Sequence, residues 1–559
     1  MEEPTLILAS PRSNYHAFLP ISLMGGFLRE LSEHLRIKVW FAFVAALAAV
    51  SLLFNHRRPL DSPRSKTASI PKGPMELPIL GSFLSLKRYP ERTLHRWAKY
   101  YGPIYSVWLG NQLFVIVSEP GIAKGLMATH GAVFSDRKEM FIKSQTVLVG
   151  RGITASPYSK RWRKHRRIAS LWLSRKAVES YTHVLDFEAT DMISHLHRDC
   201  GNGMADVNPQ VYADQCSLNN MLTITFSFRT DSAHHPMVAL ALRLSREFMN
   251  ITGPVSNLVD FVPILQRLPS SMRCRARTLH SELVNVYGGL IKEIAEKMQA
   301  GGEVQDCLVK TMLLRKEKEA LDELDVTMLA SAFIIGGIET TASVMQWFTA
   351  LIPAHPHVQT RAQEELDRVV GRDRLPTVED EANLPYCSAI VKEVERCHNP
   401  FWLGTPHMAN RDSVYGEHLI PKGTVVVLNT WTMHHDPERW GSPMEFAPDR
   451  YANEQLHSSA SAKLPNPKER DHWIFAAGRR ICPGMLVAER EIRLTVSRML
   501  WAFDTHPIAG KPIDLNEYDG ESGRSPMPFE VRLRPRFPGV RKILEEESER
   551  WRIGSTSHC

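Results

Sequence analysis

A cysteine between two glycines, directly ahead of a helix, constrains this chain more than any other feature. Residues 475–484 read FAAGRRICPG, and residues 485–501 carry the periodicity of a helix. Cys482 therefore stands at the start of a helix, where the dipole and free backbone N–H groups lower the pKa of a thiol. A thiolate there can act as a nucleophile or as an axial metal ligand. Residues 475–501 contain no His or Asp to serve as the base that a nucleophile needs.

The residues around this cysteine suit a large planar group. Gly478 and Gly484 would let such a group approach the backbone, and Arg480 offers a fork for a carboxylate. The segment resembles the signature F-x-x-G-x-R-x-C-x-G of the cytochrome P450 family and matches all of its fixed positions. The resemblance implies that Cys482 is the axial thiolate ligand of a haem iron. It also implies that Arg480 binds a haem propionate, that Phe475 shields the sulfur and that Gly484 adjoins the haem.

A long apolar segment predicts a second important helix. It covers residues 325–352, with Asp325 as the N-cap and Pro353 ending it. Gly336 and Gly337 lie in its interior, where each glycine costs about 1 kcal/mol relative to alanine. We therefore expect something to need the space beside them.

An acid and two hydroxyls follow these glycines as Glu339, Thr340 and Thr341. A threonine there can donate to the carbonyl four residues back and distort the helix, which would open a groove. The alternative is a core helix with a polar patch. The pattern is similar to the family's [A/G]-G-x-[D/E]-T-[T/S], and the resemblance gives Glu339 and Thr340 the catalytic role of delivering protons to dioxygen.

Two further patterns gain meaning from the same resemblance. Glu393 and Arg396 form an E-x-x-R pair on one helix face, and Arg450 belongs to a later P-x-R element. In the family such residues form a buried structural network beneath the haem. One departure lies nearby, since Asn399 stands where many relatives have proline.

Basic residues in the first half of the chain predict further haem contacts. Trp162 and Arg166 lie one helical turn apart and match the family's W-x-x-x-R, which implies contacts to the propionates. His407 stands where relatives often place another such contact. The neighbouring Arg163 and Lys164 read as a solvated basic surface, which would also suit an acidic electron donor.

The N-terminal region predicts a membrane anchor. Residues 37–54 include sixteen without charge and would span roughly 27 Å, the thickness expected of the endoplasmic reticulum bilayer. A buried core helix and a cleaved signal peptide are the alternatives. We expect a single-pass anchor with a cytosolic catalytic domain. Residues 1–36 stay unassigned, and the basic, proline-rich residues 55–81 are predicted to form a rigid linker.

The remainder predicts one large, mainly helical domain with a small β part, the cytochrome P450 fold, over residues 82–544, followed by a polar tail, 545–559. Residues 104–109 and 113–117 read as a β-hairpin, and 425–428 as a strand. A net charge of +7 spread along the chain argues against a nucleic acid partner. Eight scattered cysteines without a C-x-x-C pair argue against a disulfide scaffold or a cysteine-rich zinc site.

These observations favour a membrane-anchored haem-thiolate monooxygenase, most like fungal enzymes of secondary metabolism. The implied cofactors are haem b, O2 and electrons from NADPH, delivered by a separate reductase because the chain has no flavin or dinucleotide fingerprint. The substrate is expected to be a lipophilic small molecule. A haem-thiolate isomerase or dehydratase, a non-catalytic haem protein and, more distantly, a cysteine hydrolase are the alternatives. Predicted substrate contacts are Phe333, Gly337, Phe401 and Phe529.

Overall fold

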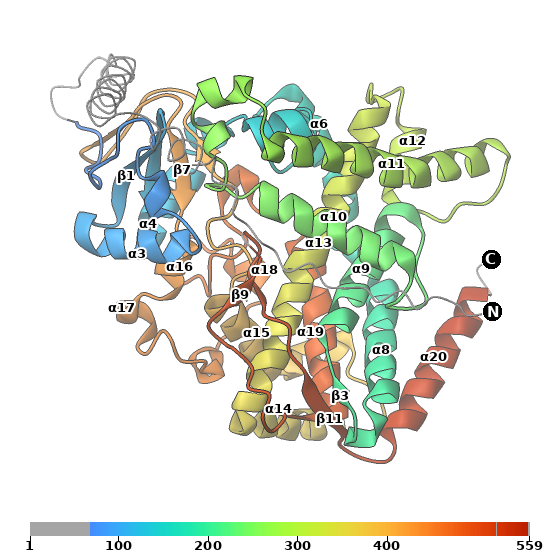
Figure 1. Cartoon of the computed structure of the whole chain (residues 1–559). Helices are drawn as coiled ribbons and strands as arrows, with labels where there is room; N and C mark the ends of the chain where they lie inside the picture. The colour runs from blue at the N-terminus through green and yellow to red at the C-terminus, as the bar shows by residue number, and fades with distance from the viewer. Residues whose placement is uncertain (1–67, 521, 557–559) are drawn as a thin grey trace, which may run out of the picture. The chain divides into compact units, whose positions relative to one another are not determined.

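The computed structural model of the protein describes residues 68–520 and 522–556. The predicted anchor at 37–54, the unassigned residues 1–36 and most of the predicted linker lie outside this part of the chain. Within it, helices dominate and small sheets lie to one side (Figure 1). The prediction of a mainly helical fold with a small β part is confirmed.

The helices account for most of the described chain, and their bounds follow the order of the sequence. They are α3 (Pro90–Tyr101), α4 (Pro120–Lys124), α5 (Gly131–Phe134), α6 (Lys160–Leu173), α7 (Arg175–Ser180), α8 (Thr182–Asp199), α9 (Gln210–Phe226), α10 (Pro236–Ile251), α11 (Ser271–Gln299), α12 (Leu308–Leu314), α13 (Glu323–Leu351), α14 (Pro356–Val369), α15 (Pro385–Cys397), α16 (Thr430–His434), α17 (Pro437–Trp440), α18 (Ser458–Ser461), α19 (Met485–Ala502) and α20 (Val540–Thr556).

The strands form small sheets among the described residues. One sheet has the order β1-β2-β7-β4 and another the order β3-β11-β8, while β9 pairs with β10 and β5 with β6. Their bounds are β1 (Ile104–Leu109), β2 (Gln112–Val117), β3 (Asp206–Val207), β4 (His407–Met408), β5 (Ser413–Tyr415), β6 (His418–Ile420), β7 (Val425–Leu428), β8 (Phe503–His506), β9 (Tyr518–Asp519), β10 (Ser525–Pro526) and β11 (Val531–Pro535).

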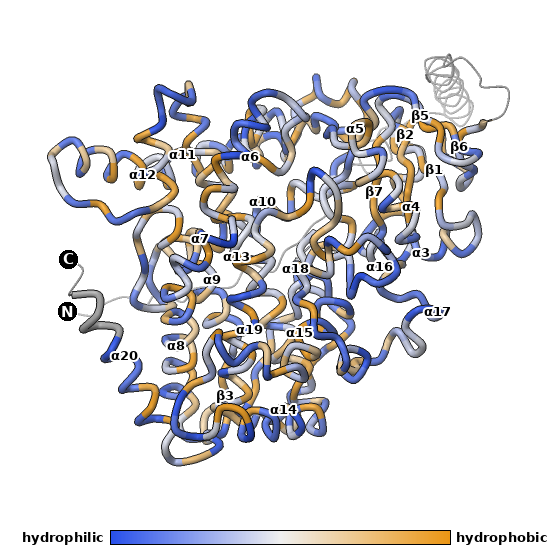
Figure 2. Tube along the Cα trace, turned by 180° about the vertical axis from the view of Figure 1, so that it is seen from behind, coloured by the Kyte–Doolittle hydropathy of each residue, from blue (hydrophilic) through white to orange (hydrophobic). Residues whose placement is uncertain are grey.

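The predicted hairpin and the predicted third strand meet in the first of these sheets. β1 and β2 pair antiparallel, with Ile104 opposite Val117, and Gly110 turns the chain at a φ of 59°. β7 then pairs in parallel with β2, with Phe114 opposite Val425. Both strands are buried on two faces, which explains their unbroken apolar sequences. Figure 2 shows these hydrophobic strands in orange and the outer segment around α17 in blue.

Helix α13 lies at the centre of the helical part and packs against α9, α10, α11 and α19 (Figure 1). Residues 323–354 form the one helix in the described chain that is long and apolar enough to cross a membrane, but most of it is buried in protein. Its N-cap is Asp322 rather than the predicted Asp325, because the Asp322 carboxylate accepts from the backbone N–H of Asp325 at 2.6 Å. Asp325 completes a capping box from inside the first turn.

Both ends of the described chain are attached to the body. In the predicted linker, Lys72 accepts through its carbonyl from the Ser106 N–H at 3.0 Å, and Ser69 pairs with His418 beside β6. At the other end, α20 runs through residue 545, where the polar tail was expected to begin. Val540 and Leu544 anchor this helix in the core next to α8.

Candidate functional site

The loop that carries Cys482 is folded back on itself ahead of α19. The Cys482 N–H donates to the carbonyl of Phe475 at 3.0 Å, so the two ends of the motif are joined directly. Gly478 has a φ of 70°, and a Cβ there would collide with the backbone carbonyl of Met127. Ala476 also adopts a left-handed φ, of 58°, although it has a side chain. The motif therefore uses its glycines to hold a tight turn against a neighbouring segment.

Burial dominates the electrostatics of the cysteine. Desolvation raises the pKa of the Cys482 thiol, although the N–H groups of Gly484 and Met485 and the charge of Arg166 act in the opposite direction. The prediction that the helix start lowers this pKa is therefore wrong for the protein alone. A cation bound directly to the sulfur would supply the missing stabilisation, since a coordinating thiol is deprotonated outright.

Arg480 is buried beside this loop and points at backbone carbonyls. Its guanidinium donates to Ser135 at 2.8 Å and to Ser156 at 2.9 Å, and lies 4.0 Å from the ring centroid of Trp162. Trp162 in turn donates its indole N–H to the carbonyl of Ile153 at 2.9 Å. Burial lowers the pKa of Arg480 to about 10, and the charge of Arg166 contributes to the fall.

The sequence analysis missed a second buried arginine, Arg137. It is 6% exposed, and it donates to the carbonyls of Thr405 at 2.5 Å and Pro406 at 2.7 Å. Its Nε is buried and has no hydrogen-bond partner among the described residues. Burial and the charge of Arg480 lower its pKa. No local pattern distinguishes Arg137, because its importance arises from a contact across more than 260 residues.

Arg166 and His407 complete the polar surroundings. Arg166, on α6, donates to the carbonyl of Ile481 at 2.5 Å, next to the cysteine. His407, on β4, is buried with its Nδ1 at 2.7 Å from the carbonyl of Phe134, and burial lowers its pKa well below the ordinary value. His407 is therefore neutral and offers a polar edge rather than a charge.

These residues together fit a haem. Arg137, Arg166 and Arg480 repel one another in a buried space, and Asp136 is the acid that offsets Arg137 and Arg480. Buried charges are stable only when they are paired. The two carboxylates of a haem would pair with this excess, and Cys482 would offer the iron a sulfur ligand.

The distal helix presents its open face at a different glycine from the one predicted. Gly336 has open space around it, whereas a Cβ on Gly337 would collide with the side chain of Met221 on α9. Gly337 therefore allows two helices to approach, and the free face lies at Gly336, one residue before the predicted substrate contact. The Thr340 hydroxyl donates to the Gly336 carbonyl at 2.8 Å, as expected, but α13 continues through this contact without a break.

Glu339 lies in a small polar cluster at the side of α13. Its carboxylate is 4.0 Å from Nε of Arg246, and Arg246 pairs with Asp519 at 3.1 Å. Burial raises the pKa of Glu339 to about 7, and the nearby Asp214 and Asp519 add to the rise. Glu339 can thus gain and lose a proton near neutral pH.

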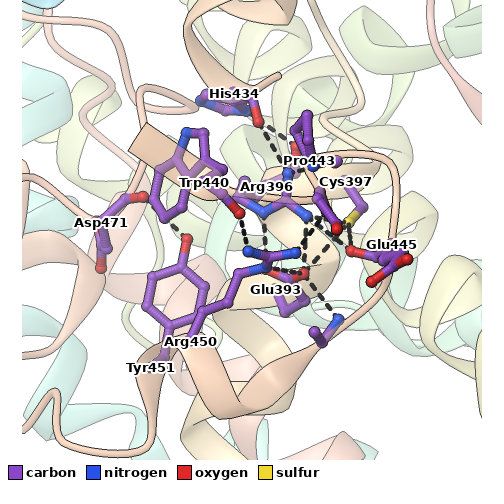
Figure 3. A network of polar contacts seen from close by, with 12 residues as sticks. Glu393, Arg396, Cys397, His434, Trp440, Pro443, Glu445, Arg450, Tyr451 and Asp471 are labelled. Carbon is purple, nitrogen blue, oxygen red and sulfur yellow. Dashed lines mark hydrogen bonds and ion pairs between the residues drawn. The ribbon is translucent and has the colours of Figure 1, made fainter. Parts of the chain in front are cut away.

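Glu393, Arg396 and Arg450 are brought together in a buried network (Figure 3). Arg396 donates through Nε and Nη2 to the two oxygens of Glu393, both at 2.7 Å, and both side chains are fully buried. Arg450 donates through Nε to the same carboxylate at 3.3 Å. Arg396 also donates at 2.8 Å to the carbonyls of His434 and Pro443, so the helix is tied to the loop that follows α16.

The other predicted substrate contacts lie in different environments. Phe333 and Phe529 are buried in the hydrophobic core, which leaves no face for a ligand in this conformation. Phe401 is half-buried in a loop that Asn399 organises. The Asn399 side chain accepts from the Phe401 N–H at 2.8 Å and donates to the Thr430 hydroxyl at 3.1 Å. The residue that replaces the usual proline therefore fixes the loop by hydrogen bonds.

Comparison with known proteins agrees with this site. The family model described as Cytochrome P450 matches residues 71–533. Cytochrome P450 monooxygenase polD of Polytolypa hystricis is 33% identical, over 85% of this chain and 92% of its own length. Cytochrome P450 monooxygenase fogE of Aspergillus ruber is 31% identical, over 90% and 92%. The chain therefore belongs to the cytochrome P450 family, and the predicted haem-thiolate monooxygenase class is confirmed.

Proposed function

We propose that Cys482 is the axial ligand of haem b and that Arg137, Arg166 and Arg480 bind the haem propionates, with Trp162 and His407 beside them. The observation that carries this assignment is the excess of buried guanidinium charge around one cysteine loop. A thiolate-ligated haem, when bound, activates O2 so that one oxygen atom enters a C–H bond of the substrate and the other leaves as water. The protein holds the sulfur in place through the Cys482–Phe475 hydrogen bond.

Protons for this reaction would pass through Glu339 and Thr340. Glu339 is 16% exposed and its pKa is about 7, so it can take up a proton at the protein surface and release it inwards. The Thr340 hydroxyl donates to Gly336, which leaves its oxygen lone pairs free to accept a proton from a neighbouring donor. The two residues are adjacent on α13 beside the open face at Gly336.

Glu393, Arg396 and Arg450 would serve haem incorporation by holding α15 to the loop before Cys482. Their full burial and double hydrogen bonding support a structural role. Gly484 and Phe475 would border the haem as parts of the same loop.

Electrons would come from an NADPH-dependent reductase that docks on the basic face of α6. Lys160, Arg161 and Arg163 are exposed there, close in sequence to Arg166. Residues 37–54 would anchor the protein in the endoplasmic reticulum membrane with its catalytic domain in the cytosol. The similarity to fungal monooxygenases supports a lipophilic small-molecule substrate from a secondary-metabolite pathway.

The test is the spectrum of the reduced, carbon-monoxide-bound protein in membranes. A strongly red-shifted Soret band is expected, and Cys482→Ala should abolish it. Thr340→Ala should keep the band but uncouple NADPH consumption from product formation. Normal coupling in Thr340→Ala would refute the proton pathway, and the absence of haem would refute the whole assignment. An isomerase would turn over without NADPH or O2.

A further inference from the structure

A cationic pocket lies beside the proposed haem site, where segments that are distant in sequence meet. It encloses about 420 Å³, including its open mouth, which is within the range of small-molecule sites. Residues 137–143, residues 252–260 and residues 404–406 all contribute to its walls. Met140 and Ala155 give it an apolar side. The established family membership does not assign a ligand to this pocket.

Lys143 is the unusual residue in this pocket. It is 8% exposed, on the turn Phe141–Val147, and it makes no hydrogen bond or ion pair within 4 Å among residues 68–550. Its ammonium lies 5.4 Å from the ring centroid of Phe248. A buried ammonium is costly unless it has an anionic partner or a metal-like substitute for water. The protein therefore keeps a cation in the wall of a cavity without satisfying it.

The other charges in the pocket do not neutralise this lysine. Arg137 and Lys138 line the same cavity, and Asp260 is the acid that faces them. One oxygen of Asp260 already accepts from the Ile142 N–H at 2.9 Å. Even if Arg137 is assigned to a haem propionate, Lys138 and Lys143 still outnumber Asp260.

We propose that this pocket binds the carboxylate, or an equivalent anionic group, of a lipophilic substrate, with Lys143 as the residue that recognises the anion. The inference rests on the proposed function and narrows its substrate class from lipophilic molecules to lipophilic acids. The ammonium of Lys143 would donate to the acid, and the apolar walls at Met140 and Ala155 would contact the adjoining hydrocarbon. Asp260 would oppose the acid and set its affinity.

The test compares matched acids and amides on the full-length holoprotein. Dodecanoic acid and dodecanamide, and naphthoic acid and naphthamide, are bound by equilibrium dialysis and followed in parallel by the haem difference spectrum. Acids are expected to bind at least about tenfold more tightly than their amides, the scale of one charge-assisted hydrogen bond. Lys143→Met should reduce this preference to less than about twofold, and Lys143→Arg should keep it.

Two further variants make the test independent of folding defects. Asp260→Asn should increase the preference for acids, because it removes the opposing charge and keeps an acceptor for Ile142. Lys292→Met, which changes an exposed lysine on α11, is the matched control and should leave the preference unchanged. If Lys143→Met does not fold, the increase in Asp260→Asn decides the question.

The outcomes separate this proposal from the haem assignment. Equal binding of acids and amides by the wild type, or a preference that survives Lys143→Met, overturns the proposal. Loss of haem from Lys143→Met without any acid preference in the wild type also overturns it, because the lysine would then serve a propionate. The carbon-monoxide band of the same samples reports on the haem thiolate separately.

Discussion

The left-handed backbone at Ala476 gives a quantitative test of the cysteine loop. A side chain in this conformation costs about 1–2 kcal/mol, which glycine does not incur. Glycine also gains about 0.4–1 kcal/mol of entropy in the unfolded chain, which offsets part of the benefit. Ala476→Gly should therefore stabilise the folded protein by about 0.5–1 kcal/mol. Because a large haem protein unfolds irreversibly, the measurement is the half-life of the thiolate carbon-monoxide band at a fixed elevated temperature.

Two variants bracket this prediction. Gly478→Ala adds a Cβ against the immobile backbone carbonyl of Met127 and a left-handed φ, so it should shorten the half-life or prevent haem incorporation. Ala452→Gly makes the same change as Ala476→Gly at an ordinary φ of −57°, and it should be destabilising by about 0.5–1 kcal/mol. If Ala476→Gly shortens the half-life as Ala452→Gly does, the argument from backbone strain is refuted.

Other predictions follow from the buried charges. Arg396→Leu strands the Glu393 carboxylate and should cost about 3–5 kcal/mol, seen as loss of haem-loaded protein; normal loading would contradict the network's role. Burial raises the pKa of Glu491 to about 7, so its contribution to stability is full below about pH 4.5 and is lost as the pH rises through 7. Glu491→Gln, which keeps the acceptor for Ser217, should flatten urea stability over that range, and an unchanged profile would contradict this. Arg137→Leu should weaken haem retention against apomyoglobin, and equal retention would remove it from the site.

The local features of this chain could be predicted because short-range rules determine them. The hairpin of β1 and β2 follows from alternating apolar sequence around Gly110, and α19 begins within one turn of Cys482 as the glycines indicate. The start of α13 was predicted three residues late because Asp322 and Asp325 are both good caps. Only the backbone geometry shows which of them accepts the hydrogen bond.

The rest of the site depends on contacts between distant segments, which no local pattern contains. Arg137 and Lys143 became recognisable once residues near 260 and 405 were placed beside them. The Cys482 pKa was mispredicted because the helix start is a local property, whereas desolvation depends on everything packed around the loop. Gly337 was assigned to the substrate because its neighbour Met221 lies on another helix.

The parallel pairing of β2 with β7 has a consequence for how the protein is made in the cell. Phe114 leaves the ribosome about 300 residues before its partner Val425, which is roughly 15–60 s at ordinary rates of synthesis. Throughout that time the hairpin has an unpaired apolar edge, which is a template for aggregation. Cys482 emerges later still, so haem cannot be captured until this edge has been protected. The yield of active enzyme should therefore depend on chaperones that cover β2 during synthesis and on haem supply only afterwards.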